Sequence, residues 1–264
     1  MNEKENSRIT SQLKGRIDTN RKFGSVDLDE WLFEKLDIGK GSNILDVGCG
    51  TGNHLIKLAE NFPDGSYYGI DISSGSIDEA KRKAAQKNLR INFICGDASD
   101  TKVLPNNFFD IIISIYSLYY VEDAQKTLAA MKSKLKMGGK IAVMSPYKRN
   151  NEEWYGFLSP FIKIPGKIEW IADNFMDNEV LPFAKRNFKK VETHNFENKI
   201  IVPSCQDLEK YWKSNIYHKE EYEEEFSKHA ADFFRKNKAF TITKRALLAI
   251  MISTPPNPVI QNPH

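Results

Sequence analysis

The stretch Ile44-Leu45-Asp46-Val47-Gly48-Cys49-Gly50-Thr51-Gly52 joins a short apolar run to a glycine at every second position. Glycine tolerates positive φ and carries no Cβ, so the backbone can turn sharply here and a ligand can lie directly against it. A helical pattern begins at His54, and the free N–H groups at a helix N-terminus can face such a ligand. This stretch therefore predicts a strand, a ligand-binding turn and a helix.

Strand-like and helix-like segments alternate around this turn. This alternation is typical of βαβ units, which have right-handed crossovers and form a parallel sheet. We therefore expect an α/β fold. The expected strands are 43–47, 66–71, 91–95, 109–114 and 140–144, and the expected helices are 26–36, 54–61, 76–88 and 124–135.

The pattern changes after Pro146. Residues 147–188 are rich in aromatic side chains and are interrupted by three prolines. Further on we expect extended segments at 188–196 and 200–202, helices at 205–214 and 220–237, and a last strand at 241–253. The expected organisation is a flexible N-terminal arm or lid (1–25), a cofactor-binding core (26–146), the remaining sheet with substrate-cap insertions (147–254) and a loose tail (255–264).

Composition excludes several classes of protein. The chain has 264 residues and a formal net charge of +3, so no strong basic surface predicts a nucleic-acid partner. Its three cysteines, Cys49, Cys95 and Cys205, lie far apart, which argues against disulfides and structural zinc. We expect no metal site, no membrane segment and no secretory signal, and hence a cytoplasmic protein.

The spacing of the glycines separates two kinds of cofactor site. Dinucleotide-binding turns follow GxGxxG, whereas this turn reads GxGxG and has Asn53 at the position of the third dinucleotide glycine. Acidic residues follow the next two strands, as Asp71 in Gly69-Ile-Asp and as Asp97 in Cys95-Gly-Asp. This ordered set, over residues 26–146, resembles the signature of class I S-adenosylmethionine-dependent methyltransferases of the small-molecule type.

The resemblance implies a Rossmann-like, doubly wound, mostly parallel seven-stranded sheet with helical cap insertions near the C-terminal half. It also implies S-adenosyl-L-methionine as cofactor and S-adenosyl-L-homocysteine as product. A carboxylate at Asp71 can accept hydrogen bonds from both ribose hydroxyls, and Asp97 with the following N–H is expected to hold the adenine. The expected cofactor-binding residues are Asp46, Gly48, Cys49, Gly50, Gly52, Asp71, Ile72, Asp97, Ala98 and Ser114.

No general base can be assigned from the sequence. Tyr119 and Tyr120 stand where many relatives carry a histidine, and His194 and His218 lie in the region expected to cover the pocket. The sulfonium already activates the methyl group, so proximity and orientation are the main requirements. We expect methyl transfer to an O or N atom of a small-molecule metabolite or natural-product intermediate, by a monomer or homodimer.

Three alternatives stay open at this point. The first is a nucleotide-dependent oxidoreductase, against which the glycine spacing argues. The second is a protein or nucleic-acid methyltransferase, for which the sequence holds no basic groove or substrate motif. The third is a non-catalytic module that keeps the cofactor fold and binds a partner protein.

Overall fold

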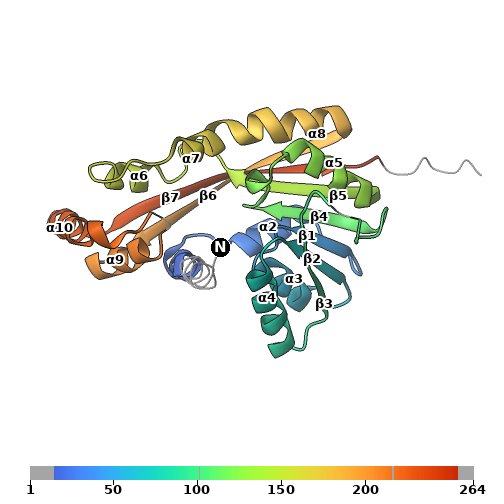
Figure 1. The fold of residues 1–264 in the computed structure, drawn as a ribbon, viewed down its shortest axis with the longest axis horizontal. Coiled ribbons are helices and arrows are strands. Elements are labelled where there is room, and N and C mark those ends of the chain that lie inside the picture. The colour runs from blue at the N-terminus through green and yellow to red at the C-terminus, as the bar shows by residue number, and fades with distance from the viewer. Residues whose placement is uncertain (1–14, 101, 216, 255–264) are drawn as a thin grey trace, which may run out of the picture. The chain divides into compact units, whose positions relative to one another are not determined.

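The computed structural model describes residues 15–100, 102–215 and 217–254. Within them, a seven-stranded sheet has the strand order β3-β2-β1-β4-β5-β7-β6 (Figure 1). The strand order reverses between β1 and β4, and ligands of doubly wound sheets bind at such a switch point. The strands are β1 Asn43–Val47, β2 Ser66–Asp71, β3 Ile91–Cys95, β4 Phe109–Ile115, β5 Leu135–Pro146, β6 Lys190–Val202 and β7 Phe240–Ile252.

Most neighbouring strands are parallel. β1 pairs in parallel with β2 and β4, β2 with β3, and β4 with β5. β7 runs antiparallel to β5, because Ser253 N donates to Gly139 O and Tyr147 N donates to Arg245 O. The predicted Rossmann-like, doubly wound, mostly parallel sheet is confirmed.

The helices connect the strands, and α3 and α4 contact β2 and β3 (Figure 1). The side chain of Ser73 caps α4, and that of Asp123 caps α5. The α-helices are α2 Leu28–Leu36, α3 Asn53–Asn61, α4 Ser74–Gln86, α5 Ala124–Lys134, α6 Glu152–Leu158, α7 Gly166–Trp170, α8 Leu181–Asn187, α9 Cys205–Lys213 and α10 Glu223–Phe234. The 3-10 helices are η1 Leu118–Tyr120 and η3 Glu220–Tyr222, and η2 Ile171–Val180 is a π-helix.

Two strands, β5 and β6, differ from the sequence prediction by more than one residue. β5 begins at Leu135 rather than at residue 140, because Leu135 already pairs with Phe109 before the register shifts and Lys140 pairs with Ile111. The residues between form a bulge, in which Gly138 adopts a φ of 78°. β6 is one continuous strand over 190–202, where two separate extended segments were predicted.

The chain forms two compact units, each assembled from three stretches. Among the described residues, unit 1 comprises 15–32, 146–173 and 195–246, and unit 2 comprises 33–145, 174–194 and 247–254. Residues 15–23 are helical, although they fall in the segment predicted as a flexible arm. The remainder of that arm up to residue 14 and the predicted tail 255–264 lie outside the described residues.

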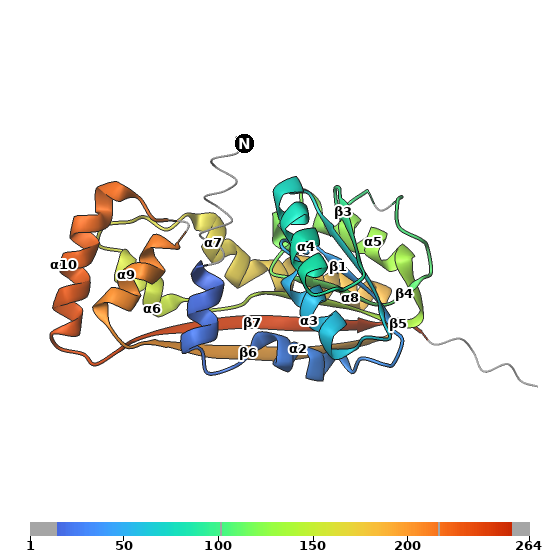
Figure 2. The same cartoon turned by 90° about the horizontal axis from the view of Figure 1, so that it is seen from below.

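Unit 1 has its own aromatic core. Trp154 of α6 packs edge-on against Tyr211, and Trp212 stacks on Phe226 with ring centroids 5.0 Å apart. α9 and α10, which carry three of these rings, lie side by side (Figure 2). Burial of such large rings is the main source of stability for this unit.

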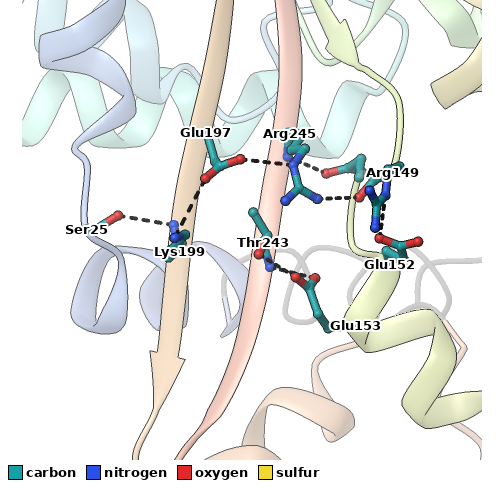
Figure 3. A network of polar contacts seen from close by, with 9 residues as sticks. Ser25, Arg149, Glu152, Glu153, Glu197, Lys199, Thr243 and Arg245 are labelled. Carbon is teal, nitrogen blue, oxygen red and sulfur yellow. Dashed lines mark hydrogen bonds and ion pairs between the residues drawn. The ribbon is translucent and has the colours of Figure 1, made fainter.

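A polar network joins three segments of unit 1 (Figure 3). The Glu153 carboxylate accepts hydrogen bonds from Thr243 Oγ1 at 2.6 Å and Thr243 N at 3.1 Å. Arg245 Nε donates to Glu197 at 3.0 Å, and its Nη1 donates to the Arg149 carbonyl at 2.9 Å. Burial raises the pKa of Glu153, but the hydrogen bonds from Thr243 and from the Glu153 backbone, together with the charge of Arg245, outweigh it, so the pKa lies below its ordinary value.

The buried side chain of Asn198 on β6 anchors the residues that precede α2. Its Oδ1 accepts hydrogen bonds from Ser25 N at 2.8 Å and Val26 N at 3.1 Å, and its Nδ2 donates to Val26 O at 3.1 Å. Beside this contact, Gly24 and Ile200 form an antiparallel bridge. Both segments belong to unit 1.

Candidate functional site

The glycine turn follows β1 in unit 2 and is held by the end of β2. Gly48 N and Cys49 N both donate to Ile70 O, at 2.8 and 3.1 Å. Gly48, Gly50 and Gly52 have φ values of 77°, 52° and 73°, a backbone region that other residues rarely adopt. The turn ends at Gly52, which is the N-cap of α3.

The three glycines are required for different reasons. A Cβ on Gly48 would lie 2.4 Å from the Cβ of Ser117, and a Cβ on Gly52 would lie 2.8 Å from the Phe93 ring. A Cβ on Gly50 would meet no atom of the described chain within 4 Å. Packing against the protein thus explains two of the glycines, whereas Gly50 borders open space, where a ligand can approach the backbone.

Asp71, at the end of β2, is bound to this turn. Its Oδ2 accepts a hydrogen bond from Gly50 N at 2.8 Å, and its Oδ1 accepts one from Ser73 N at 2.9 Å. A carboxylate has about four acceptor positions, so about two are left for a ligand. The next side chain, Ile72, is 78% exposed and offers an apolar surface beside the carboxylate.

Asp97 follows β3, the neighbour of β2. Its Oδ1 accepts a hydrogen bond from Ser99 N at 2.7 Å, and its side chain is exposed. The hydrogen bonds from Ser99 lower the pKa of the Asp97 carboxyl, so it is ionised at neutral pH. Ala98 beside it is half-buried. Asp71 and Asp97 therefore follow two adjacent strands at the same edge of the sheet.

The loop after β4 contacts the glycine turn through serine side chains. The hydroxyls of Ser114 and Ser117 lie 2.7 Å apart, and Ser117 Oγ donates to Val47 O at 2.8 Å. Ser114 is fully buried, so it supports the loop from within the sheet. The contact of Ser117 could not be predicted from the sequence, because no motif marks a contact between residues 70 positions apart.

Two side chains next to Gly48 are buried, that of Asp46 in β1 and that of Cys49 in the turn. Burial, together with the nearby carboxylates of Asp46 and Asp71, raises the pKa of the Cys49 thiol far above its ordinary value. The thiol is therefore protonated at neutral pH and is a poor nucleophile. This agrees with a space-filling role for its side chain.

A lysine that was not predicted from the sequence is hydrogen-bonded to the start of α3. Lys83 Nζ, from α4, donates to Thr51 Oγ1 at 2.9 Å and to Asn53 Oδ1 at 3.0 Å. These contacts tie two consecutive helices together next to the glycine turn. No sequence pattern relates residues 30 positions apart on different helices in this way.

Two of the four candidate bases are tyrosines of unit 2, the unit that holds the glycine turn. Tyr119 and Tyr120 belong to η1, directly after the β4 loop. The Tyr119 ring packs edge-on against Phe175, with centroids 5.9 Å apart, and Tyr120 is 67% exposed.

His194 lies on β6, the outermost strand, with its Nε2 3.8 Å from a Glu192 carboxylate oxygen. His218 belongs to unit 1, where its Nε2 lies 2.9 Å from Glu223 Oε1 and its ring packs against Trp212. His194 and the two tyrosines belong to unit 2 and His218 belongs to unit 1, and a base role for any of the four stays a prediction.

The described residues contain neither a cluster of metal ligands nor a membrane-spanning helix. Across the described ranges, no three or more His, Cys, Asp or Glu side chains gather in a way that could hold a metal ion. In the same ranges, no helix combines the length and the apolar character that a membrane crossing requires.

A family model described as a methyltransferase domain matches residues 38–224, well over half of the chain. The chain belongs to this methyltransferase family. The match includes the glycine turn, Asp71, Asp97 and the loop after β4. The family that the glycine spacing and the two acids predicted is thereby confirmed.

One curated relative is the aklanonic acid methyltransferase DauC of a Streptomyces species. It is 38% identical over 122 residues, which are 46% of this methyltransferase and 54% of the relative. The chain thus spans about half the length of this relative.

Solved structures share the fold at low sequence identity. The YcgJ protein of Bacillus subtilis superposes with a TM-score of 0.59 at 14% identity, over 86% of this chain and 97% of that one. A phosphoethanolamine N-methyltransferase 2 of Haemonchus contortus, in complex with phosphomonomethylethanolamine and S-adenosylhomocysteine, superposes with a TM-score of 0.56 at 16% identity. That superposition covers 86% of this chain and 52% of the Haemonchus chain. Both comparisons support the Rossmann-like assignment.

Proposed function

We propose that this protein is an S-adenosylmethionine-dependent methyltransferase that acts on an O or N atom of a small-molecule metabolite or natural-product intermediate. The observation that carries the proposal is the pairing of Gly50 with Asp71. A backbone open to a ligand lies within hydrogen-bond distance of a carboxylate that keeps about two acceptor positions. Both stand at the switch point of the sheet, where ligands of this architecture bind.

The residues around this pairing suit the parts of the cofactor. The remaining acceptor positions of Asp71 match the two ribose hydroxyls. The exposed apolar side chain of Ile72 can pack on the adenine ring, and Asp97 with the N–H of Ala98 can bind the adenine edge. We assign the turn from Gly48 to Gly52 to the methionine portion of the cofactor. The presence of S-adenosylhomocysteine in the Haemonchus relative supports this choice of cofactor.

When bound, S-adenosylmethionine supplies an activated methyl group: a lone pair of the acceptor bonds to the methyl carbon as the S–CH₃ bond breaks, and the electron pair stays on sulfur. The protein then has to hold the acceptor in line and keep water out. Rigid support of the turn by Ser117 and Lys83 serves this positioning. An acceptor that must lose a proton passes it to solvent or to a nearby base.

A small-molecule acceptor is favoured by two observations. The name of the Streptomyces relative specifies aklanonic acid, a small organic molecule, as that protein's substrate. The formal net charge of +3 provides no strong attraction for nucleic acid. A monomer or a homodimer is compatible with this role.

Isothermal titration calorimetry with S-adenosylhomocysteine tests the cofactor. We expect saturable binding with one site per chain, and an absence of binding would overturn the assignment. Fluorescence quenching by reduced nicotinamide dinucleotide in a parallel titration would instead indicate an oxidoreductase. To find the acceptor, the protein is incubated with a metabolite extract and methyl-labelled S-adenosylmethionine, and label transferred to a small molecule is sought by mass spectrometry.

A further inference from the structure

Lys83 of α4 is hydrogen-bonded to the two residues that flank the last glycine of the turn. Its Nζ donates to Thr51 Oγ1 at 2.9 Å and to Asn53 Oδ1 at 3.0 Å. Gly52, between these two residues, is the N-cap of α3 and has no side chain that could fix the backbone there. One ammonium group therefore holds both neighbouring side chains at the point where the glycine turn becomes a helix.

The stability of α3 does not explain a lysine at this place. A positive charge beside a helix N-terminus is electrostatically unfavourable, and the first turn of α3 contains no acidic residue that would offset it. The Lys83 side chain is half-buried, and its partner Thr51 is only 8% exposed, so these contacts are partly shielded from water. Lys83 thus acts on the shape of the turn and not on the helix dipole.

The lysine competes with local capping of α3. Threonine and asparagine side chains readily accept hydrogen bonds from nearby backbone N–H groups, and the first N–H groups of a helix have no partner within the helix. Because Lys83 donates to both oxygens, the Thr51 and Asn53 side chains are held toward α4. The lysine therefore opposes their use as caps, which would occupy N–H groups at the end of the turn.

We propose that Lys83 is a positioning residue for the cofactor, which holds Thr51 and Asn53 so that the end of the glycine turn keeps the shape that binds the methionine portion. The inference rests on the proposed function, which assigns this turn to that portion. Asp71, which we assign to the ribose, is held by two backbone N–H groups instead. Loss of the lysine should therefore weaken binding of the methionine portion and leave that of the adenosine portion largely unchanged.

The test compares two ligands that share the adenosine portion. S-adenosylhomocysteine carries the whole amino-acid chain, whereas 5′-methylthioadenosine keeps the sulfur and lacks the amino and carboxylate groups. The first is titrated by calorimetry, and the affinity of the second is obtained from the shift that it causes in this titration. The proteins are the wild type, Lys83→Met and Lys81→Met, which is the matched control because Lys81 is exposed on the same helix and its replacement makes the same change of charge.

We expect Lys83→Met to bind S-adenosylhomocysteine about tenfold more weakly, since two charge-assisted hydrogen bonds no longer hold the turn, and to bind 5′-methylthioadenosine within about twofold of the wild type. Lys81→Met should bind both as the wild type does. A merely structural role of Lys83 would weaken both ligands alike. Equal weakening of both, no weakening of S-adenosylhomocysteine binding, or the same selective loss in Lys81→Met would overturn the proposal.

A double-mutant cycle tests whether Lys83 acts through the turn. Thr51→Val keeps the shape of the side chain and removes the Oγ1 acceptor of the lysine. If Lys83 acts through this contact, the double variant should bind S-adenosylhomocysteine more tightly than the product of the two single losses predicts. Independent losses would refute the positioning role, whereas failure of the wild type to bind S-adenosylhomocysteine would refute the proposed function itself.

Discussion

Replacing Asp71 with asparagine is the sharpest perturbation of the cofactor site. In the wild type, Oδ2 accepts from Gly50 N at 2.8 Å and Oδ1 accepts from Ser73 N at 2.9 Å. An asparagine keeps one oxygen but places an NH₂ group against one of these two N–H donors. The variant therefore loses the negative charge, one loop hydrogen bond and part of the capacity to accept from ribose hydroxyls.

The size of the effect follows from the bonds that are lost. A hydrogen bond to a charged group contributes about 1.5–3 kcal/mol. We expect two hydrogen bonds from the ribose hydroxyls to Asp71, and the asparagine removes about one of them. The affinity for S-adenosylhomocysteine should therefore fall by roughly 10- to 150-fold. The backbone N–H that faces the NH₂ group loses its acceptor. The free energy of unfolding of the ligand-free protein should therefore fall by about 1–3 kcal/mol.

Calorimetry with S-adenosylhomocysteine measures the affinity, and urea denaturation of the ligand-free protein measures the stability. Asp78→Asn is the matched control, because Asp78 is exposed on neighbouring α4 and its replacement makes the same change of charge. An affinity for Asp71→Asn within twofold of the wild type would refute the ribose role. An equal loss in Asp78→Asn would show that net charge, not the contact, governs binding.

Two further predictions concern the glycine turn and the polar network of unit 1. Gly48→Ala should lower the free energy of unfolding by about 2–4 kcal/mol, because its Cβ overlaps Ser117 and its φ is positive. Gly50→Ala should lower the free energy of unfolding by only about 1–2 kcal/mol and should mainly abolish S-adenosylhomocysteine binding. Urea denaturation measures the first effect and calorimetry the second, and equal stabilities of the two variants would contradict the packing argument. The hydrogen bonds from Thr243 help to depress the pKa of Glu153, and their stabilisation of the fold is fully present above the unfolded-state pKa of about 4.5. This stabilisation is lost as the pH falls through the lower folded-state pKa, so the wild type should lose more stability than Glu153→Gln between pH 6 and pH 3. Urea denaturation across that range measures both proteins, and equal losses of stability would contradict the prediction.

The half of the fold that carries the site could be predicted from the sequence, because its signals are local. The strands at 43–47, 66–71 and 91–95 have the bounds that their short apolar runs, closed by glycine or aspartate, had indicated. The acids Asp71 and Asp97 were placed correctly because parallel strands bring their carboxyl ends to one edge. No knowledge of packing was needed for either step.

Elements that depend on distant partners could not be predicted in the same way. The sequence predicted a helix over 124–135 and a strand from residue 140, yet the pairing of Leu135 with Phe109 extends β5 backwards across a bulge. The two extended segments merge into one strand, β6, which is hydrogen-bonded to its neighbour β7. The helix at 15–23 was missed because its polar composition resembles that of a disordered arm.

The candidate site shows the same division. The residues that we propose to bind the cofactor were visible as a sequence motif, whereas the contacts that fix their geometry were not. Ser117 against Gly48 and Lys83 at the start of α3 are side-chain contacts between elements far apart in the chain. Tyr116, directly after β4, likewise has a positive φ of 55°, and no motif in the sequence marks it.

The Asn198 anchor has a consequence for the order of events on the ribosome. Asn198 follows Val26 by 172 residues, so this partner of the N-terminal segment is synthesised much later than the segment itself. At about 5–20 residues per second, the delay is roughly 10–35 s. During that interval the backbone groups of Ser25 and Val26 have only water or transient partners. Ser25 and Val26 thus leave the ribosome long before their native partner on β6 exists.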